Sequence, residues 1–452
     1  MKVLVLNGSP AGKNSITLQT VLFLEKSFPS CSFEILQVGQ RIKALEKDFT
    51  AAREALQSAD LILFCYPVYT FLVPAQLHRF LELMKERQVS LSGKYATQIS
   101  TSKHFYDTTA HQFIEDNCAD LGLRYIRGLS ADMEDLLTEK GREEAVTFFR
   151  FVLWSVAKNW ERTEVPATAQ FRAVCASAAQ KAEKGAGGVV LVTDLSPESG
   201  TALQTMIDRF CAVMPRNVRI VDLREFPFAG GCLGCFHCAA DGTCVYRDGF
   251  EAFLRERIQS ADAIVYAYTI RDHSMGSRFK LYDDRQFCNG HRTVTMGKPV
   301  GYLVDGPLDR ESNLRTLMEA RAQVGGNFLA GIATDQRNPD GEIDQLADTL
   351  EYAITRQFQM PQNFYGVGGL KIFRDLIFQM RGLMREDHRF YKEHGFYDFP
   401  QKRRGRIAVM YLVGTMMRSR KLSGKMSGKM TEGMIMPYQK VLRNALPQEE
   451  QS

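Results

Sequence analysis

The chain has 452 residues, of which 45% are hydrophobic and 24% charged. These values are typical of a globular protein and exclude a fibrous or disordered chain, and the length predicts two domains with an appendage. The formal net charge of +5 is concentrated in residues 401–440, where ten Lys or Arg stand against one Glu. The body is therefore mildly acidic and predicts no nucleic-acid partner, whereas the basic tail is a candidate surface for an acidic partner.

The termini predict neither a signal peptide nor a membrane anchor. The apolar run that begins at Met1 turns at Gly8, before it reaches the length of a signal sequence. The longest late apolar stretch, Ile407 to Met417, has eleven residues, whereas roughly 20 are needed to cross a bilayer. We therefore expect a cytoplasmic protein without a transmembrane segment.

Strand-like apolar runs alternate with helical patterns along the chain. In the first part we predict strands at 3–6, 33–38, 61–65, 95–100 and 123–126, with helices that include 17–26 and 44–57. Such alternation is typical of a parallel sheet with helices on both faces. The sequence predicts an α/β fold with two flavodoxin-like doubly wound parallel-sheet domains, 1–170 and 186–358, joined by a linker at 176–188. Residues 359–452 are predicted to form a mainly helical extension and a basic tail.

Short matches in one register suggest that the second domain is a copy of the first. They lie 202 to 204 residues apart and pair Gln57 to Asp60 with Gln259 to Asp262, Gly93-Lys94 with Gly297-Lys298, and Gly128 to Asp132 with Gly331 to Asp335. Ser9-Pro10 matches Ser196-Pro197 at a shorter spacing, which indicates an insertion in the second copy. We interpret the chain as an internal duplication.

Three loops of the first copy are predicted to meet at the carboxyl edge of its sheet. The first leaves the strand at Asn7-Gly8 and leads into a helix, so its N–H groups and the helix dipole favour a phosphate. Taken alone, it would equally suit a serine-rich helix cap. The second loop, Tyr66 to Phe71, offers a proline and aromatic rings that can flank a planar group, and the third, Thr97 to Tyr106, is polar. Together the loops suit a flavin mononucleotide.

These motifs carry a family resemblance. Asn-Gly-Ser-Pro at 7–10 with Lys-Asn-Ser at 13–15, and Tyr-Pro-Val-Tyr at 66–69, resemble the NAD(P)H-dependent FMN reductases, which are flavodoxin-like. The resemblance implies an FMN-containing oxidoreductase with NAD(P)H as a possible co-substrate. It also implies the FMN-binding residues, namely Ser9, Lys13, Asn14, Ser15 and Thr17 for the phosphate and Pro67, Val68, Tyr69, Thr70, Thr101 and Ser102 for the ring system.

The second copy departs from this pattern. Asp194 and Glu198 stand in the loop where the phosphate dianion would bind, an arrangement that repels it. We therefore predict one FMN per chain, in the first copy.

The insertion in the second copy contains four closely spaced cysteines. Cys232, Cys235, Cys238 and Cys244 follow the pattern Cys-x2-Cys-x2-Cys-x5-Cys, which favours a 4Fe-4S cluster in a reducing compartment. Structural zinc sites more often separate two cysteine pairs by a longer segment, and zinc or metal-free thiols stay open as alternatives. The segment also resembles the iron–sulfur flavoproteins, in which such a motif precedes an Asp, here Asp248.

The predicted function is electron transfer between a donor, either NAD(P)H or ferredoxin, a 4Fe-4S cluster, FMN and an unknown acceptor. One alternative is an NAD(P)H-dependent quinone or nitro reductase with a structural zinc site. Another is an electron carrier or docking protein without its own substrate, and a homo-oligomer also stays open. Because the flavin motifs and the cysteines lie on different copies, we predict that the copies pack as a pseudo-dimer. The cysteine loop should then face the flavin edge of the first copy or of a neighbouring chain.

Overall fold

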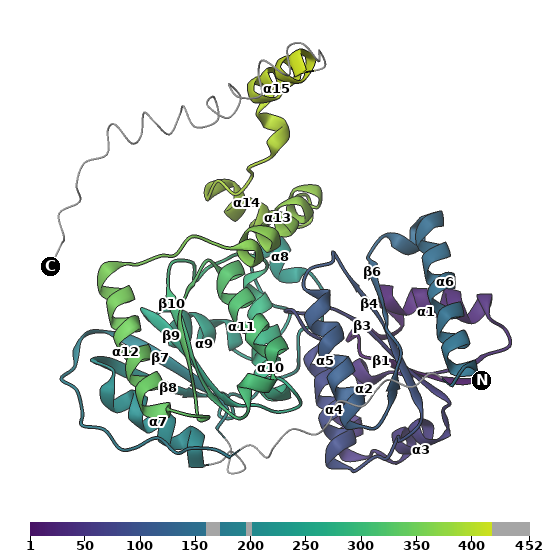
Figure 1. Ribbon diagram of the computed structural model, residues 1–452, viewed down its shortest axis with the longest axis horizontal. Helices are drawn as coiled ribbons and strands as arrows, with labels where there is room; N and C mark the ends of the chain where they lie inside the picture. Colours follow the sequence, from purple (N-terminus) through teal and green to yellow (C-terminus); the bar gives the residue numbers. More distant parts are fainter. Residues whose placement is uncertain (160–171, 196–200, 418–452) are drawn as a thin grey trace. The chain divides into compact units, whose positions relative to one another are not determined.

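The computed structural model describes residues 1–159, 172–195 and 201–417 (Figure 1). Close contacts group residues 1–390 into one unit and the residues from Tyr391 onward into another. The first unit contains both predicted copies, which we call the first half and the second half. The second unit is described by itself.

The first half is built on a parallel sheet in the strand order β2-β1-β3-β4, with β5 and β6 pairing with β4 one after the other along its length. Val3 and Val5 of β1 face one side of the sheet and Leu4 and Leu6 face the other, and all four are fully buried, as expected for a sheet covered on both faces. Its strands are β1 Lys2–Asn7, β2 Ser32–Leu36, β3 Leu61–Pro67, β4 Tyr95–Ser102, β5 Arg124–Tyr125 and β6 Leu129–Asp132, and its helices are α1 Ile16–Ser27, α2 Val38–Lys47, α3 Thr50–Ser58, α4 Ala75–Glu86, α5 Asp107–Asp120 and α6 Glu139–Ala157.

The second half repeats this topology. Its parallel sheet has the order β8-β7-β9-β10-β11, the same order as in the first half when the strands are taken in chain order. The predicted α/β class with two flavodoxin-like sheets is therefore confirmed. The strands are β7 Gly185–Thr193, β8 Arg216–Asp222, β9 Ala263–Thr269, β10 Pro299–Asp305 and β11 Phe328–Thr334, and the helices are α7 Thr201–Val213, α8 His237–Asp241, α9 Phe250–Phe253, α10 Gly276–Arg285, α11 Ser312–Gly325 and α12 Pro339–Arg356.

The two halves pack through equivalent helices. Helix α4 lies against α10, and α5 lies against α11, whereas α1 and α6 cover the outer face of one sheet and α7 and α12 the outer face of the other (Figure 1). One apolar core runs through the contact and includes Phe80 and Phe113 from the first half with Phe279 and Leu317 from the second. The halves thus have the pseudo-dimeric arrangement that the sequence predicts.

Three predicted boundaries are wrong. The helix predicted at 44–57 is two helices, because α2 ends at Lys47 and the Asp48 carboxylate accepts a hydrogen bond from Thr50 N–H at 2.9 Å, where α3 begins. The strand predicted at 33–38 ends at Leu36, and Val38 starts α2. The predicted linker at 176–188 overlaps β7, which begins at Gly185 because these glycines pair with β8 despite their low strand propensity.

The C-terminal helices follow the second half. Helix α13, Phe364–Gln379, packs on α11 so closely that a Cβ atom at Gly369 would lie 2.7 Å from Val324 Cγ2. Helix α14 spans Arg385–Glu393, and α15 spans Arg404–Met417 in the second unit. Much of the predicted basic tail, from residue 418 on, lies outside the described residues. Within the described ranges, none of the helices has the length and apolarity to cross a membrane.

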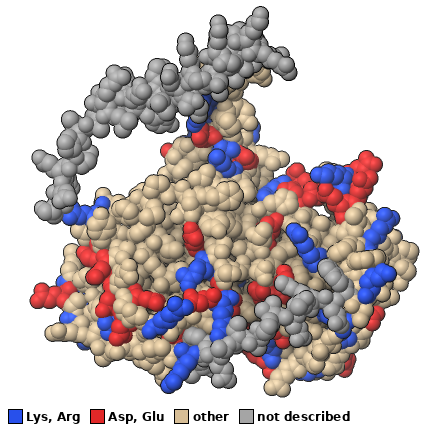
Figure 2. Space-filling model, viewed as in Figure 1, with Lys and Arg blue, Asp and Glu red and all other residues tan. Residues whose placement is uncertain are grey.

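Charged side chains mix on the visible face of residues 1–390. Figure 2 shows Lys and Arg interspersed with Asp and Glu there. This mixed surface agrees with a body that carries little net charge of its own.

Candidate functional site

The first predicted loop, between β1 and α1, is held by its own polar groups. The Asn7 amide donates to Gly12 O at 3.0 Å and accepts from Ser9 N–H at 3.2 Å, and Ser15 Oγ caps α1 by accepting from Leu18 N–H at 3.4 Å. The N–H groups of Ile16 and Thr17, in the first turn, have no acceptor within the helix. A helix start of this kind suits an anion.

The structure brings the three predicted loops together. Thr17 Oγ1 lies 2.6 Å from Thr101 Oγ1, and Val68 N–H donates to Thr101 O at 3.1 Å. The loop after β1 is thereby tied to the end of β4, and the end of β4 to the loop after β3. All eleven predicted flavin residues lie at this carboxyl edge, with Ser9, Ser15, Thr17, Thr101 and Ser102 buried, Pro67, Val68, Tyr69 and Thr70 half-buried, and Lys13 and Asn14 exposed.

Two features of this edge fit a bound FMN. The Ser102 hydroxyl is buried and has no hydrogen-bond partner among the described residues, a costly state that a ligand oxygen or nitrogen would relieve. Thr70 and Phe71 adopt left-handed backbone angles, with φ of 41° and 70°, in a tight turn closed by Tyr69 and Leu72. Such strain in residues other than glycine is concentrated at ligand sites.

The cysteine loop lies between β8 and α9. Its course is set by left-handed residues at Gly234, Phe236 and Gly242, with φ of 62°, 59° and 82°, so that Cys238 falls on the short helix α8. Gly234 N–H donates to Cys232 Sγ at 3.4 Å. Hydrogen bonds from backbone N–H groups to sulfur are a feature that tunes iron–sulfur sites.

Burial raises the pKa of two of the predicted ligand thiols. The pKa of Cys232 lies well above its usual range because the side chain is shielded from water. The pKa of Cys238 is raised to about 11 by burial and then by Asp387 and the neighbouring thiols of Cys235 and Cys244. The Cys232 and Cys238 thiols are therefore neutral at pH 7, and a bound metal or cluster would hold them as thiolates.

The base of the cysteine loop is closed by an ion pair. Both oxygens of Asp248 accept hydrogen bonds from Arg285 at 2.8 Å, and the same carboxylate accepts from Ala229 N–H at 3.1 Å. Although burial alone would raise the pKa of Asp248, these donors lower it to about 2. Arg285 is itself 1% exposed and lies over the Tyr246 ring.

The cysteine loop touches the flavin edge of the first half. A Cβ atom at Gly234 would lie 1.9 Å from Tyr69 Oη, and one at Gly231 would lie 2.7 Å from Gln76 Nε2. The Phe287 ring lies edge-on to Tyr69 with 6.2 Å between centroids. The loop that carries the predicted cluster residues therefore contacts the loop that carries predicted flavin residues.

The carboxyl edge of the second half is acidic instead. Asp305, at the end of β10, accepts from Thr269 Oγ1 at 2.8 Å and lies beside the buried Asp335. Burial and then the charge of Asp305 raise the pKa of Asp335 to about 7, and burial raises that of Asp194 to about 6. Glu198, part of the predicted repulsive loop, lies outside the described residues.

Charged residues of α10 that contact the two loops, Arg285 among them, were missed by sequence reasoning. Lys280 and Asp284 of α10 are both fully buried and form an ion pair that contacts the Tyr69 loop. Their spacing of four residues on a helix was visible, but it is equally typical of a solvated helix face. The duplication register supplied a further signal, since a shift of 202 residues aligns them with His78 and Glu82.

The comparison with protein families agrees with this fold. The two flavodoxin-like sheets and the carboxyl-edge loops define the class of flavodoxin-like flavoproteins. The family model for NADPH-dependent FMN reductase matches residues 1–117. This part of the chain is therefore similar to the NADPH-dependent FMN reductases.

Solved structures give distant matches. An FMN-dependent NADH-azoreductase from Bacillus anthracis, in complex with FMN, is 14% identical, with 33% of this chain and 98% of that chain covered and a TM-score of 0.27. An NAD(P)H:quinone oxidoreductase from Methanothermobacter marburgensis is 13% identical, with coverages of 37% and 99% and a TM-score of 0.28. A putative quinone reductase from Klebsiella pneumoniae is 15% identical, with coverages of 38% and 88% and a TM-score of 0.26. No curated protein matches the chain.

Proposed function

We propose that the protein exchanges electrons between FMN in its first half and a 4Fe-4S cluster in its second half, with NAD(P)H or ferredoxin as donor. The contact between the cysteine loop and the Tyr69 loop, at Gly234, is the observation that carries this proposal. Two redox groups exchange electrons efficiently only when they are close, and this contact would bring their binding loops together. A plain reductase would not require a cysteine loop at that place.

For FMN, the chain supplies a helix start and hydroxyl donors on one side and the Tyr69 loop on the other. Ser9, Ser15 and Thr17 would bind the phosphate, and the buried Ser102 hydroxyl would bond to the ring system. When bound, FMN takes up two electrons as a hydride from a nicotinamide and gives electrons singly to a one-electron centre. The protein's own part is to orient the ring and to exclude water from it.

For the cluster, the ligands would be Cys232, Cys235, Cys238 and Cys244. A tetrahedral zinc ion bound at its usual distance would hold four sulfurs about 3.8 Å apart. Among the described residues, the groups of three or more ligand atoms that lie within 4.8 Å of one another contain none of these cysteines. The compact Cys-x2-Cys-x2-Cys-x5-Cys pattern favours a 4Fe-4S cluster, which relays single electrons.

Anaerobic purification of the full chain from iron-replete cells tests the proposal. We expect bound FMN, iron and acid-labile sulfide, and broad absorbance at about 400 nm that is lost in air. Rapid mixing with NADPH, NADH or reduced ferredoxin should bleach the flavin band with at least one donor. Iron-free protein with stoichiometric zinc and full NAD(P)H-driven quinone reduction would instead support the zinc-stapled reductase. Protein that carries FMN but turns over no small acceptor would support the carrier alternative.

A further inference from the structure

Helix α10 presents three charged side chains that are almost fully shielded from water. Lys280 and Asp284 are 0% exposed, and Arg285 is 1% exposed. Buried charges are retained only where every one of them is paired. The partners of these three residues lie in the two candidate cofactor loops.

Lys280 and Asp284 hold the flavin loop of the first half. The Lys280 ammonium donates to Tyr69 O at 2.9 Å, to Thr70 Oγ1 at 2.5 Å and to the Asp284 carboxylate. Its three hydrogens are thereby satisfied, two of them by the loop. Asp284 in turn accepts from Thr70 Oγ1 at 2.6 Å and from Ala75 N–H at 2.9 Å. This ion pair fixes the strained turn that would flank the flavin ring.

Arg285, the next residue, holds the cysteine loop. The Arg285 guanidinium donates two hydrogen bonds of 2.8 Å to the Asp248 carboxylate and one of 2.9 Å to Gly230 O. Paired hydrogen bonds of this kind fix orientation as well as distance. Gly230 and Asp248 stand on either side of the four cysteines, so one guanidinium joins the two ends of the loop.

We propose that α10 is a positioning helix that sets the flavin loop and the cysteine loop against each other. This inference rests on the proposed function and deepens it, because it assigns separate tasks to adjacent residues. Lys280 and Asp284 position the flavin loop, and Arg285 positions the cluster loop. None of the three touches a reacting atom.

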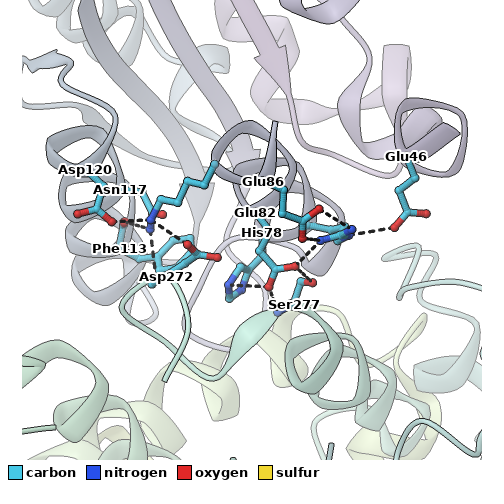
Figure 3. A network of polar contacts seen from close by, with 11 residues as sticks. Glu46, His78, Glu82, Glu86, Phe113, Asn117, Asp120, Asp272 and Ser277 are labelled. Atoms are coloured by element: carbon cyan, nitrogen blue, oxygen red, sulfur yellow. Dashed lines mark hydrogen bonds and ion pairs between the residues drawn. The ribbon is translucent and has the colours of Figure 1, made fainter. Parts of the chain in front are cut away.

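The equivalent contact on the other side of the pseudo-dimer provides a matched control. Figure 3 shows Glu82 of α4 beside Ser277 of the second half. Ser277 N–H donates to Glu82 Oε1 at 2.6 Å, as Ala75 N–H donates to Asp284. A shift of 202 residues relates the two contacts. Here, however, the turn that is held belongs to the half with the acidic edge.

The carboxylates at this control site are paired with basic side chains, so the site needs no metal ion. His78, Glu82 and Asp272 bring three potential ligand atoms within 4.8 Å of one another. Arg79 pairs with Glu82 at 2.9 Å and Lys85 with Asp272 at 2.8 Å. Both carboxylates are thus neutralised by the protein itself.

Three variants of the full chain, purified anaerobically, test the proposal. Lys280→Met with Asp284→Asn removes both charges of the pair, so neither is left buried alone. We expect its Kd for FMN to rise about tenfold or more, because the loop loses its preorganisation, with iron per chain unchanged. Arg285→Lys, which cannot make the paired hydrogen bonds, should lose most of its iron at unchanged FMN affinity. Glu82→Gln should change neither quantity.

A spectroscopic readout separates positioning from general destabilisation. At saturating FMN, the visible absorbance of the bound flavin should shift in the Lys280→Met, Asp284→Asn protein and stay at the wild-type position in Glu82→Gln. If the double variant fails to fold, Lys280→Gln with Asp284→Asn, which removes both charges but keeps polar side chains, decides. FMN affinity and spectrum equal to those of Glu82→Gln would overturn the inference. Wild-type protein that binds no FMN would instead overturn the proposed function.

Discussion

The two halves share a backbone plan but differ in the charge at the carboxyl edges of their sheets. In the first half, Thr101 is the penultimate residue of β4, and its hydroxyl lies 2.6 Å from that of Thr17. In the second half, Asp305 ends β10 and lies beside Asp335. A neutral pair of hydroxyls can donate a hydrogen bond to an anion, whereas the charge of Asp305 repels it.

The backbone itself has hardly changed. Thr70 and Phe71 have φ of 41° and 70°, and Asp272 and His273, at the equivalent turn, have φ of 49° and 61°. On the proposed division of tasks, one fold would host or exclude a cofactor through a few side chains at an unaltered turn. The following predictions test whether the halves have divided their tasks in this way.

The largest expected effect concerns the cysteines. Replacing any one of Cys232, Cys235, Cys238 and Cys244 with Ser should reduce iron per chain to near zero, because the cluster needs all four thiolates. FMN content should stay at the wild-type level, since the flavin residues lie on the other half. Iron and flavin analysis of the four variants checks this. Cys65→Ser, in a buried thiol of β3, serves as the control and should keep its iron.

An acid in the phosphate loop should nearly abolish flavin binding. Two negative charges about 4 Å apart repel by about 4 kcal/mol at the effective dielectric of a protein surface, so Asn14→Glu and Ser15→Glu should raise the Kd for FMN by on the order of 100-fold or more. Thr201→Glu, at the start of α7 in the second half, should leave the Kd unchanged. Fluorescence titration with FMN measures all three. Equal weakening in both halves would mean that the second half also binds FMN.

The contact between the halves at Gly234 can be broken and repaired. Gly234→Ala places a Cβ atom 1.9 Å from Tyr69 Oη and should cost about 1–3 kcal/mol from overpacking. Tyr69→Phe removes the clashing oxygen, so the double variant should recover part of the lost thermal stability. The loss of stability that comes from placing alanine in the left-handed backbone conformation of residue 234 should remain. Additive losses in a double-mutant cycle would contradict the contact.

The smallest effect is a pH dependence of the acidic edge. The folded protein holds a proton on Asp335 up to about pH 7, whereas the unfolded chain releases it at roughly pH 4. The folded state thus binds more protons in this window, and stability falls as the pH rises through it. Asp335→Asn should therefore raise the melting temperature at pH 8 and change it little at pH 5. An equal effect at both values would show that Asp335 does not titrate in this range.

Much of the fold could be predicted because local patterns specify it. The apolar runs at 61–65 and 263–266 lie within β3 and β9, and their matched flanks predicted two equivalent sheets. The break at Asp48 was missed because the spacing of apolar residues continues across it. In the structure, the Asp48 carboxylate accepts a hydrogen bond from Thr50 N–H, and a new helix starts there.

The predicted loops could be found in sequence because each follows a strand directly. The residues that hold these loops in place could not be found in the sequence. Lys280 meets Tyr69 across 211 residues, and its burial depends on how two domains dock. A charged pair on a helix gives no local sign of whether it faces water or another domain. Residue patterns thus predicted where the cofactor loops lie, and tertiary packing decides what positions them.

The cofactor content of the full chain, purified without oxygen, tests the division of tasks most directly. FMN, iron and zinc would be quantified per chain on one sample, with the Asn14→Glu protein alongside. The account predicts one FMN and about four irons in the wild type, and no FMN with unchanged iron in the variant. Two FMN per chain, or stoichiometric zinc without iron, would contradict it.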